Sequence, residues 1–138
     1  MSNFNTVLAF GAHPDDLEIG MGGTISKLIT LGYNVIMVIA TLPNFTSVDK
    51  KDERKFEAKS SATVLGCTTP KFLDLPSEEI LFGRRMVSLI DSLIKEYNAS
   101  TVFTQWIGDS HQDHQILTQS VIAASRDINN LYMYETTI

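Results

Sequence analysis

The sequence has little cysteine, little positive charge and no long hydrophobic run. Its single cysteine, Cys67, cannot form an intramolecular disulfide, which excludes a small secreted fold held together by disulfides. Eleven basic residues against 16 acidic ones give a net charge of −5, which argues against a nucleic-acid-binding surface or a patch for anionic membranes. The longest apolar run, at residues 35–40, is far too short to span a membrane.

The first residues do not have the pattern of a signal peptide. Residues 1–5 contain no basic segment followed by a long apolar stretch, so we expect no signal peptide and a cytoplasmic protein. The composition is otherwise that of a globular domain, with 43% hydrophobic and 20% charged residues. The length predicts a single domain over residues 1–138.

Strand and helix patterns alternate along the whole chain. Short apolar runs predict five strands, over residues 6–10, 34–40, 71–75, 101–104 and 131–134. Helical spacing of apolar residues predicts four helices between them, over residues 19–31, 51–65, 84–97 and 115–126, with loops at 42–49 and 76–83. This alternation is typical of a Rossmann-like three-layer α/β/α fold with a mostly parallel sheet, for which we expect the strand order 3-2-1-4-5.

All three histidines lie in the two segments where such a sheet binds its ligands. His13 follows the first expected strand, and His111 and His114 follow the fourth. In this order the two strands are neighbours, and ligands bind at their carboxyl ends. The same segments carry at least four carboxylates, among them Asp15 and Asp16. Nitrogen and oxygen ligands without thiolate fit zinc or a related divalent ion, so the sequence predicts a metal site here.

Simpler interpretations of these residues exist. Two histidines three apart in a loop are often only polar surface, and Asp15 and Asp16 before an apolar helix can serve as its N-terminal cap. The glycine-rich segment at residues 20–24 does not have the spacing of a dinucleotide-binding loop, and a His-Pro-Asp-Asp turn stands where the phosphate loop would lie. Close packing of the first helix against the sheet is the simpler explanation of these glycines.

Two motifs and one helix resemble a known enzyme family. Segment 12–18, Ala-His-Pro-Asp-Asp-Leu-Glu, with Gly-Gly-Thr at 22–24, and segment 111–114, His-Gln-Asp-His, are similar to the two signature motifs of the LmbE-like, or PIG-L-type, zinc-dependent N-acetylglucosaminide deacetylases. The Arg-x-x-Glu segment at 54–57 resembles a helix of the same family. The resemblance runs along residues 7 to about 135.

Carried over to the matching positions, the resemblance implies a role for each site residue. It implies three zinc ligands: His13, Asp16 and His114. Asp15 would be the general base that activates water, and His111 would be the general acid or a donor to the oxyanion. Asp113 would hold His111 in place, and Arg54 would contact the substrate sugar. The alternative for Arg54 is a surface ion pair with Glu57, one helical turn away.

The implied activity is removal of the N-acetyl group from an N-acetylglucosamine-type sugar conjugate by metal-activated water. Zinc is the expected cofactor, and Fe²⁺ or another divalent ion would also suit His and Asp ligands. Two alternatives stay open: a metal-binding subunit or fragment without turnover, and a zinc hydrolase that cleaves a different amide. The expected partner is an N-acetylated amino sugar or glycoconjugate, with no nucleic acid and no membrane span, and an open sheet edge would favour a homo-oligomer.

The sequence departs from the family pattern in three places. Pro-Ser-Glu-Glu at 76–79 replaces an acidic residue and a glycine that the family commonly has after the third strand. Gln112 stands where proline is usual, at a position that is not a ligand. The chain stops at Ile138, so we expect the C-terminal part of the family fold to be absent.

Three further residues have simple structural interpretations. Trp106 either stacks on a sugar face or belongs to the core. Glu18 is either a carboxylate behind the metal ligands or a favourable charge in the first turn of a helix. Cys67 is most simply a small packing residue in the turn after a helix.

Overall fold

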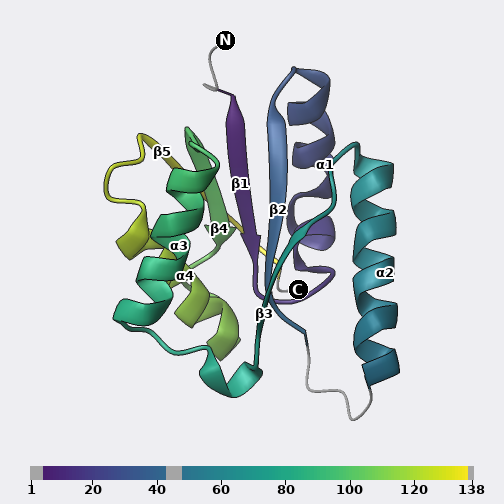
Figure 1. The fold of residues 1–138 in the computed structure, drawn as a ribbon. Coiled ribbons are helices and arrows are strands. Elements are labelled where there is room, and N and C mark those ends of the chain that lie inside the picture. Colours follow the sequence, from purple (N-terminus) through teal and green to yellow (C-terminus); the bar gives the residue numbers. More distant parts are fainter. Residues whose placement is uncertain (1–4, 43–47, 137–138) are drawn as a thin grey trace.

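A parallel five-stranded sheet organises the chain, for which the computed structural model describes residues 5–42 and 48–136. The strand order β3-β2-β1-β4-β5 confirms the predicted order (Figure 1). The strands are β1 (Thr6–Gly11), β2 (Asn34–Thr41), β3 (Lys71–Leu75), β4 (Thr101–Gln105) and β5 (Asn130–Tyr134). The helices are α1 (Asp16–Thr30), α2 (Val48–Leu65), α3 (Arg84–Glu96) and α4 (Gln112–Ala124), and a 3₁₀ turn, η1 (Ser77–Glu79), follows β3.

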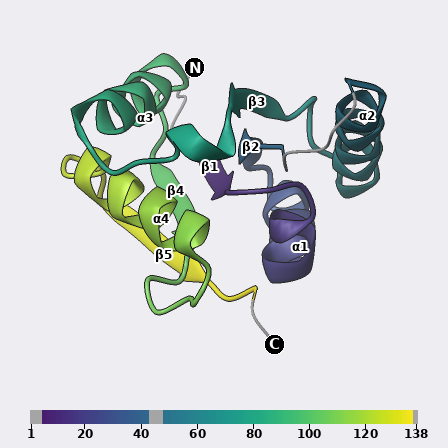
Figure 2. The same cartoon turned by 90° about the horizontal axis from the view of Figure 1, so that it is seen from below.

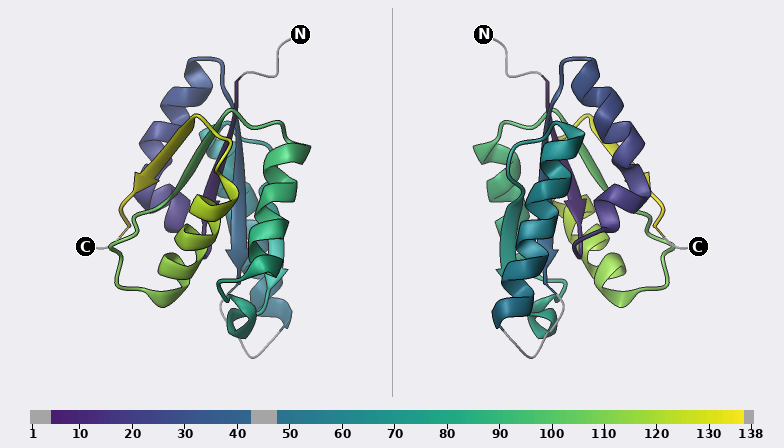
Figure 3. Two further views of the ribbon diagram at one scale, coloured as in Figure 1. Left: turned by 90° about the vertical axis from the view of Figure 1, so that its left-hand side faces the viewer. Right: turned by 90° about the vertical axis from the view of Figure 1, so that its right-hand side faces the viewer.

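Two helices cover each face of the sheet. Seen from below, α1 and α2 lie on one face and α3 and α4 on the other (Figure 2), and the side views show the same layers (Figure 3). The chain winds outward from β1 to β3 and then returns to β4 beside β1. Because parallel crossovers are right-handed, this reversal moves the helices to the opposite face and creates the switch point between β1 and β4. Among the described residues, no helix has the length and apolar character that a bilayer crossing requires.

The two central strands form the middle of the core. All six residues of β1 are buried, and so are seven of the eight in β2. Near-continuous apolar strands of this kind are typical of sheets covered on both faces. Successive side chains of β1 alternate between the faces, so Leu8 and Phe10 pack with α3 and α4, whereas Val7 and Ala9 pack with α1.

The helix boundaries differ from those predicted. α1 begins at Asp16 rather than at residue 19, because the N–H of Ile19 already bonds the carbonyl of Asp15 at 2.9 Å. Three other helices also shift: α2 begins at residue 48 rather than 51, α3 ends at 96 rather than 97, and α4 spans 112–124 rather than 115–126. Apolar spacing marks only the buried part of a helix, and the first turns of α1 and α4 carry the polar site residues.

The two predicted loops also differ from the structure. The expected loop at 76–83 contains η1. Of the expected loop at 42–49, residues 43–47 lie outside the described residues, and residues 48 and 49 already belong to α2.

Gly20 is the point where α1 and the end of β5 approach each other closely. A Cβ atom at this position would lie 2.3 Å from Cδ2 of Tyr134 and 2.8 Å from Cγ2 of Thr136. The neighbouring Gly22 and Gly23 have nothing within 4 Å of such an atom. Close packing therefore explains the first glycine of the glycine-rich segment but not the other two.

Alanine at two of these positions is expected to act in opposite directions. Gly20→Ala should lower the free energy of unfolding by about 1–3 kcal/mol, because the added methyl group must displace the buried ring of Tyr134. Gly23→Ala should raise it by about 0.5–1 kcal/mol, since alanine loses less backbone entropy in a helix than glycine does. Urea-induced unfolding of both variants measures the difference, and a stabilising effect at both positions would contradict the close approach.

Candidate metal centre

The three histidine rings meet at the carboxyl ends of β1 and β4. These strands are paired, with Val7 opposite Thr101, so the loops that follow them lie side by side. The ring centroid of His13 lies 4.9 Å from that of His111 and 5.3 Å from that of His114. The rings of His111 and His114 stack at 4.7 Å. The strand order thus brings together the two segments that carry every histidine of the sequence.

Side chains of the three predicted ligands converge on one point. Oδ2 of Asp16 lies 3.4 Å from Nδ1 of His13 and 3.2 Å from Nε2 of His114. One nitrogen or oxygen atom of each residue lies within 4.8 Å of the other two. These side chains are at most 17% exposed. Two nitrogen ligands and one oxygen ligand at this spacing suit a divalent ion.

Each histidine of this triad has a second carboxylate on its other ring nitrogen. Nε2 of His13 lies 2.8 Å from Oδ2 of Asp113, and Nδ1 of His114 lies 2.8 Å from Oδ2 of Asp109. Metal-binding histidines usually donate their second N–H to a carboxylate or carbonyl in this way. Nε2 of His114 is buried and, although close to Asp16, makes no hydrogen bond. A buried ring nitrogen without a hydrogen bond fits a metal ion as its missing partner.

The charges of this cluster shift its pKa values. Burial alone would raise the pKa of Asp16, but contacts with His114 and His13 hold that pKa well below its usual range. Burial alone would lower the pKa of His13 and of His114, but hydrogen bonds to the neighbouring carboxylates outweigh it and raise both pKa values. Protons on the rings therefore compensate the carboxylates when no ion does, and metal binding is expected to release them.

The metal-free protein is expected to lose stability as the pH rises above neutrality. A histidine with a raised folded-state pKa stabilises the fold below its unfolded pKa of about 6.5, and this contribution is lost as the pH rises through the folded value. The lowered pKa of Asp16 contributes stability above about pH 4, which is lost as the pH falls through the folded value. Unfolding temperatures of chelator-treated protein should therefore be highest between about pH 4 and 6.5. In His114→Gln the alkaline decrease should shrink, and an unchanged decrease would contradict this account.

The carboxylate of Asp15 does not belong to the ligand cluster. This residue precedes α1 in a left-handed backbone conformation, with φ of 83°, which residues other than glycine rarely adopt. Asp15 occupies the N-cap position of α1, as the simpler interpretation expects, but its side chain makes no capping hydrogen bond. Oδ2 of Asp16 accepts the backbone N–H of His13 at 2.9 Å instead. The left-handed turn thus separates two consecutive carboxylates, one in the cluster and one that is 56% exposed beside Arg54.

Arg54 links α2 to the loop after β1. Its Nη1 lies 3.5 Å from Oδ2 of Asp15 and 3.3 Å from Oε2 of Glu57. The ion pair with Glu57 is therefore present, and the same guanidinium also reaches a residue of the His-Pro-Asp-Asp turn. The role of Arg54 as a substrate contact stays a prediction.

His111 lies at the N-terminus of α4, outside the ligand triad. It caps the helix, because its Nδ1 accepts the backbone N–H of Asp113 at 3.1 Å. A neutral ring that accepts at Nδ1 carries its proton on Nε2 and can donate it from there. The carboxylate of Asp113 hydrogen-bonds His13 rather than His111, which corrects the predicted contact. At the start of α4 the backbone N–H of Asp113, rather than its carboxylate, makes the hydrogen bond to His111.

Two buried polar residues at this site have no role in the sequence-based prediction. Asp109 is 1% exposed and bonds His114, and Gln105 is fully buried and accepts the N–H of Ala12 on its Oε1 at 3.1 Å. Asp109 stands in the same acidic loop as His111, so its position was a usable signal. Burial of Gln105 at the end of β4 has no comparable signal in the sequence.

The structure also places the three residues that have simple structural interpretations. Trp106 is 44% exposed and folds over Gly108, so its interpretation as a core residue is wrong. Glu18 occupies the first turn of α1, and burial together with the nearby charge of Asp15 raises its pKa. Cys67 packs against the apolar cluster of α1 and β1, as expected for a packing residue.

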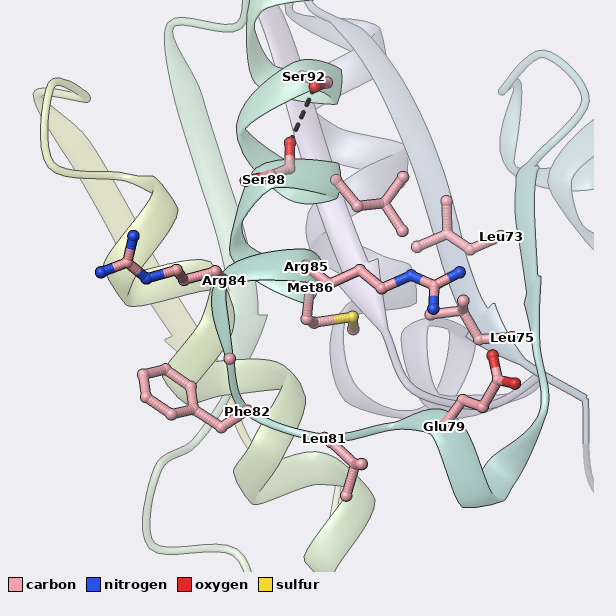
Figure 4. A pocket seen from close by; sticks show the side chains of 12 residues that line it. Leu73, Leu75, Glu79, Leu81, Phe82, Arg84, Arg85, Met86, Ser88 and Ser92 are labelled. Atoms are coloured by element: carbon pink, nitrogen blue, oxygen red, sulfur yellow. Dashed lines mark hydrogen bonds between the residues drawn. The ribbon is translucent and has the colours of Figure 1, made fainter.

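A separate groove of about 700 Å³ lies between β3, η1 and the N-terminal half of α3 (Figure 4). Leu73, Leu75 and Leu81 line it, and Arg85 extends across it toward Glu79. No ligand histidine or carboxylate of the metal centre belongs to its described lining. The segment at 76–79 that departs from the family pattern therefore contributes Glu79 to this groove.

Comparison with known proteins identifies relatives over most of the chain. The family model described as PIG-L, GlcNAc-PI de-N-acetylase, matches residues 8–125. The chain is 32% identical over 136 residues to the uncharacterized deacetylase YaiS of Escherichia coli K12. This match covers 94% of this chain and 73% of that protein. It is 30% identical over 119 residues to the diacetylchitobiose deacetylase of Thermococcus kodakarensis, and this match covers 79% of this chain and 45% of that protein.

A solved structure shares both fold and sequence with this chain. The N,N'-diacetylchitobiose deacetylase of Pyrococcus horikoshii, in complex with an inhibitor, superposes with a TM-score of 0.79 at 29% identity, over 87% of this chain and 49% of that one. This chain thus spans about half the length of the two diacetylchitobiose deacetylases. The matched residues 8–125 include both loops of the metal centre, and the chain belongs to the PIG-L family.

Proposed function

We propose that this chain is a metal-dependent N-deacetylase that releases acetate from an N-acetylated amino sugar conjugate. The proposal rests on the cluster of His13, Asp16 and His114. In this cluster a further carboxylate contacts each histidine ring, and the buried Nε2 of His114 makes no hydrogen bond. Catalytic zinc sites have three protein ligands of this kind and keep a position open for water or substrate. Relatives named as deacetylases support the reaction class.

The proposed ion is zinc, and Fe²⁺ or another divalent ion would suit the same ligands. His13, Asp16 and His114 would hold it, and Asp113 would fix the ring of His13 through the contact at 2.8 Å. When bound, such an ion lowers the pKa of a water molecule to roughly 7 and polarises the acetyl oxygen.

The flanking residues supply the proton transfers of amide hydrolysis. Asp15 would accept a proton from the attacking water, because its carboxylate lies next to the ligand Asp16 in sequence but outside the cluster. His111 would stabilise the oxyanion with a hydrogen bond from its Nε2–H. The proton that Asp15 accepts would then pass to the departing nitrogen. The C–N bond breaks, the water oxygen leaves in acetate, and the sugar nitrogen leaves as an amine.

The proposed substrate class is an N-acetylglucosamine-type sugar. Two relatives are named as deacetylases of diacetylchitobiose, which is an N-acetylated sugar. Arg54 would contact sugar hydroxyls from α2, where it already reaches the loop after β1. The exposed ring of Trp106 offers a flat surface to a sugar face.

A release assay tests this function. Zinc-loaded protein is incubated with N-acetylglucosamine, diacetylchitobiose and an N-acetylglucosamine glycolipid, and both acetate and free amine are quantified. We expect release from at least one sugar, loss of release after chelation, and recovery on adding zinc. Bound metal without release from any sugar would favour a metal-binding subunit without turnover, and release only from other amides would favour a different hydrolase.

A further inference from the structure

Asp109 is a buried carboxylate in the loop between β4 and α4 that has no part in the reaction proposed above. Its Oδ2 lies 2.8 Å from Nδ1 of His114, and its Oδ1 accepts the backbone N–H of His111 at 2.9 Å. Its carbonyl oxygen accepts the side-chain amide of Gln115 at 2.6 Å. A carboxylate that is 1% exposed needs such donors, and the two that bond its oxygens, from His111 and His114, belong to the segment that carries the site histidines.

The same carboxylate connects the two loops of the metal centre. Oγ1 of Thr136 donates to Oδ2 of Asp109 at 3.3 Å, and Nε2 of Gln105 donates to Oγ1 of Thr136 at 3.4 Å. Oε1 of Gln105 in turn accepts the N–H of Ala12, the residue before the ligand His13. This row of hydrogen bonds joins the loop after β1 to the loop after β4. Buried polar networks with satisfied members hold such segments in one arrangement.

The contact with Asp109 decides which nitrogen of His114 carries the proton. An ionised carboxylate only accepts hydrogen bonds. Nδ1 makes a hydrogen bond to Asp109, whereas the contact of Nε2 with Asp16 does not have the geometry of one, so this arrangement favours the proton on Nδ1. The neutral ring then has its lone pair on Nε2, which lies 3.2 Å from Asp16 and makes no hydrogen bond. The other tautomer would place the proton on Nε2 and exclude a metal ion from that nitrogen.

We propose that Asp109 is a positioning residue that holds His114 in its Nδ1–H tautomer and thereby keeps Nε2 available as a metal ligand. The consequence for the metal rests on the proposed metal centre, whereas the consequence for the tautomer does not. The negative charge is essential to this role, because two N–H groups point at separate oxygens of Asp109. Asparagine has one acceptor oxygen, so its NH₂ group would face one of these two donors.

Asp109→Asn tests the proposal because it keeps the shape of the side chain but changes the tautomer of His114 that this side chain favours. In this variant the amide oxygen of the asparagine would accept the backbone N–H of His111. Its NH₂ group would then donate to Nδ1 of His114 and favour the Nε2–H tautomer of that ring. We expect this change in the ¹⁵N spectrum of the imidazole in metal-free protein at alkaline pH. Zinc affinity, measured by competition with a chromogenic chelator, should fall by about 10–100-fold.

A matched control is available on the surface of α3. Asp91→Asn removes an exposed carboxylate that pairs with Lys95 at 2.7 Å. We expect neither the tautomer of His114 nor the zinc affinity to change in this variant. The unfolding temperature of each metal-free variant is measured alongside, so that a loss of fold is seen separately from a change of tautomer.

Each result has a defined meaning. A wild-type spectrum with the Nε2–H tautomer would overturn the proposal, and this measurement needs no variant to fold. The Asp109→Asn protein could be less stable and yet keep the Nδ1–H tautomer and the wild-type zinc affinity. That result would show a merely structural role for Asp109 and would also overturn the proposal. Wild-type protein that has the Nδ1–H tautomer but binds no zinc or releases no acetate would reject the proposed function and leave the role of Asp109 in orienting His114 intact.

Discussion

His114→Ala protein is expected to lose its metal while keeping its fold. The substitution removes one of the three proposed ligands, so that only His13 and Asp16 would remain, and two side chains hold zinc weakly. Metal content after zinc loading and dialysis should fall from about one ion per chain to almost none. Elemental analysis beside circular dichroism measures both quantities on the same sample.

His111→Ala is the matched control, because it removes an imidazole of the same loop. His13, His111 and Asp113 form a second group with metal-ligand spacing, so the two variants decide which group holds the ion. We expect His111→Ala protein to keep its zinc, since this ring lies outside the triad of Asp16. Loss of zinc from His111→Ala together with retention by His114→Ala would place the ion in the second group and reject the proposed centre.

Asp15→Asn protein is expected to keep its metal and lose its turnover. The side chain is 56% exposed and contacts Arg54 rather than the ligand cluster, so its removal should not disturb the ligands. Without a proton acceptor for the attacking water, kcat should fall by about 10²–10⁴-fold. The measurement is acetate release from whichever sugar the wild-type protein cleaves, at saturating zinc, with the metal content of both proteins determined in parallel.

Glu57→Gln provides the comparison for this effect. Glu57 contacts the same guanidinium as Asp15, at 3.3 Å, but belongs to α2 and not to the metal-binding motif. Its substitution should leave the turnover within severalfold of wild type. Equal losses in the two variants would assign both carboxylates to the placement of Arg54, and Asp15 would then not be the base.

The fold was predictable because its signals are local and repeat along the chain. The apolar run at 35–40 identifies a strand covered on both faces, and β2 is such a strand. Alternation of strands and helices leaves few topologies once crossovers are right-handed. The helix starts were less predictable, because the first turns of α1 and α4 are made of polar residues, such as Asp16 and Asp113, that apolar spacing cannot detect.

The convergence of the site was predictable, but the direction of its side chains was not. Strand order alone brings the loops of His13 and His114 together. Asp113 bonds His13, and Asp109 bonds the second ring nitrogen of His114. Both contacts depend on how α4 begins and how it packs against β4. The left-handed conformation of Asp15 was not predictable either, because residues other than glycine rarely adopt it.

The hydroxyl of Tyr134 donates to the carbonyl of Phe10 at 2.6 Å and so joins two residues 124 positions apart. This tyrosine comes from β5, the last described strand to leave the ribosome, and it supports the strand from which the first metal-binding loop emerges. Domains generally fold as units during synthesis. A nascent chain would therefore expose both histidine motifs before this support exists, and we expect metal loading to be a late event that follows the emergence of β5 from the exit tunnel.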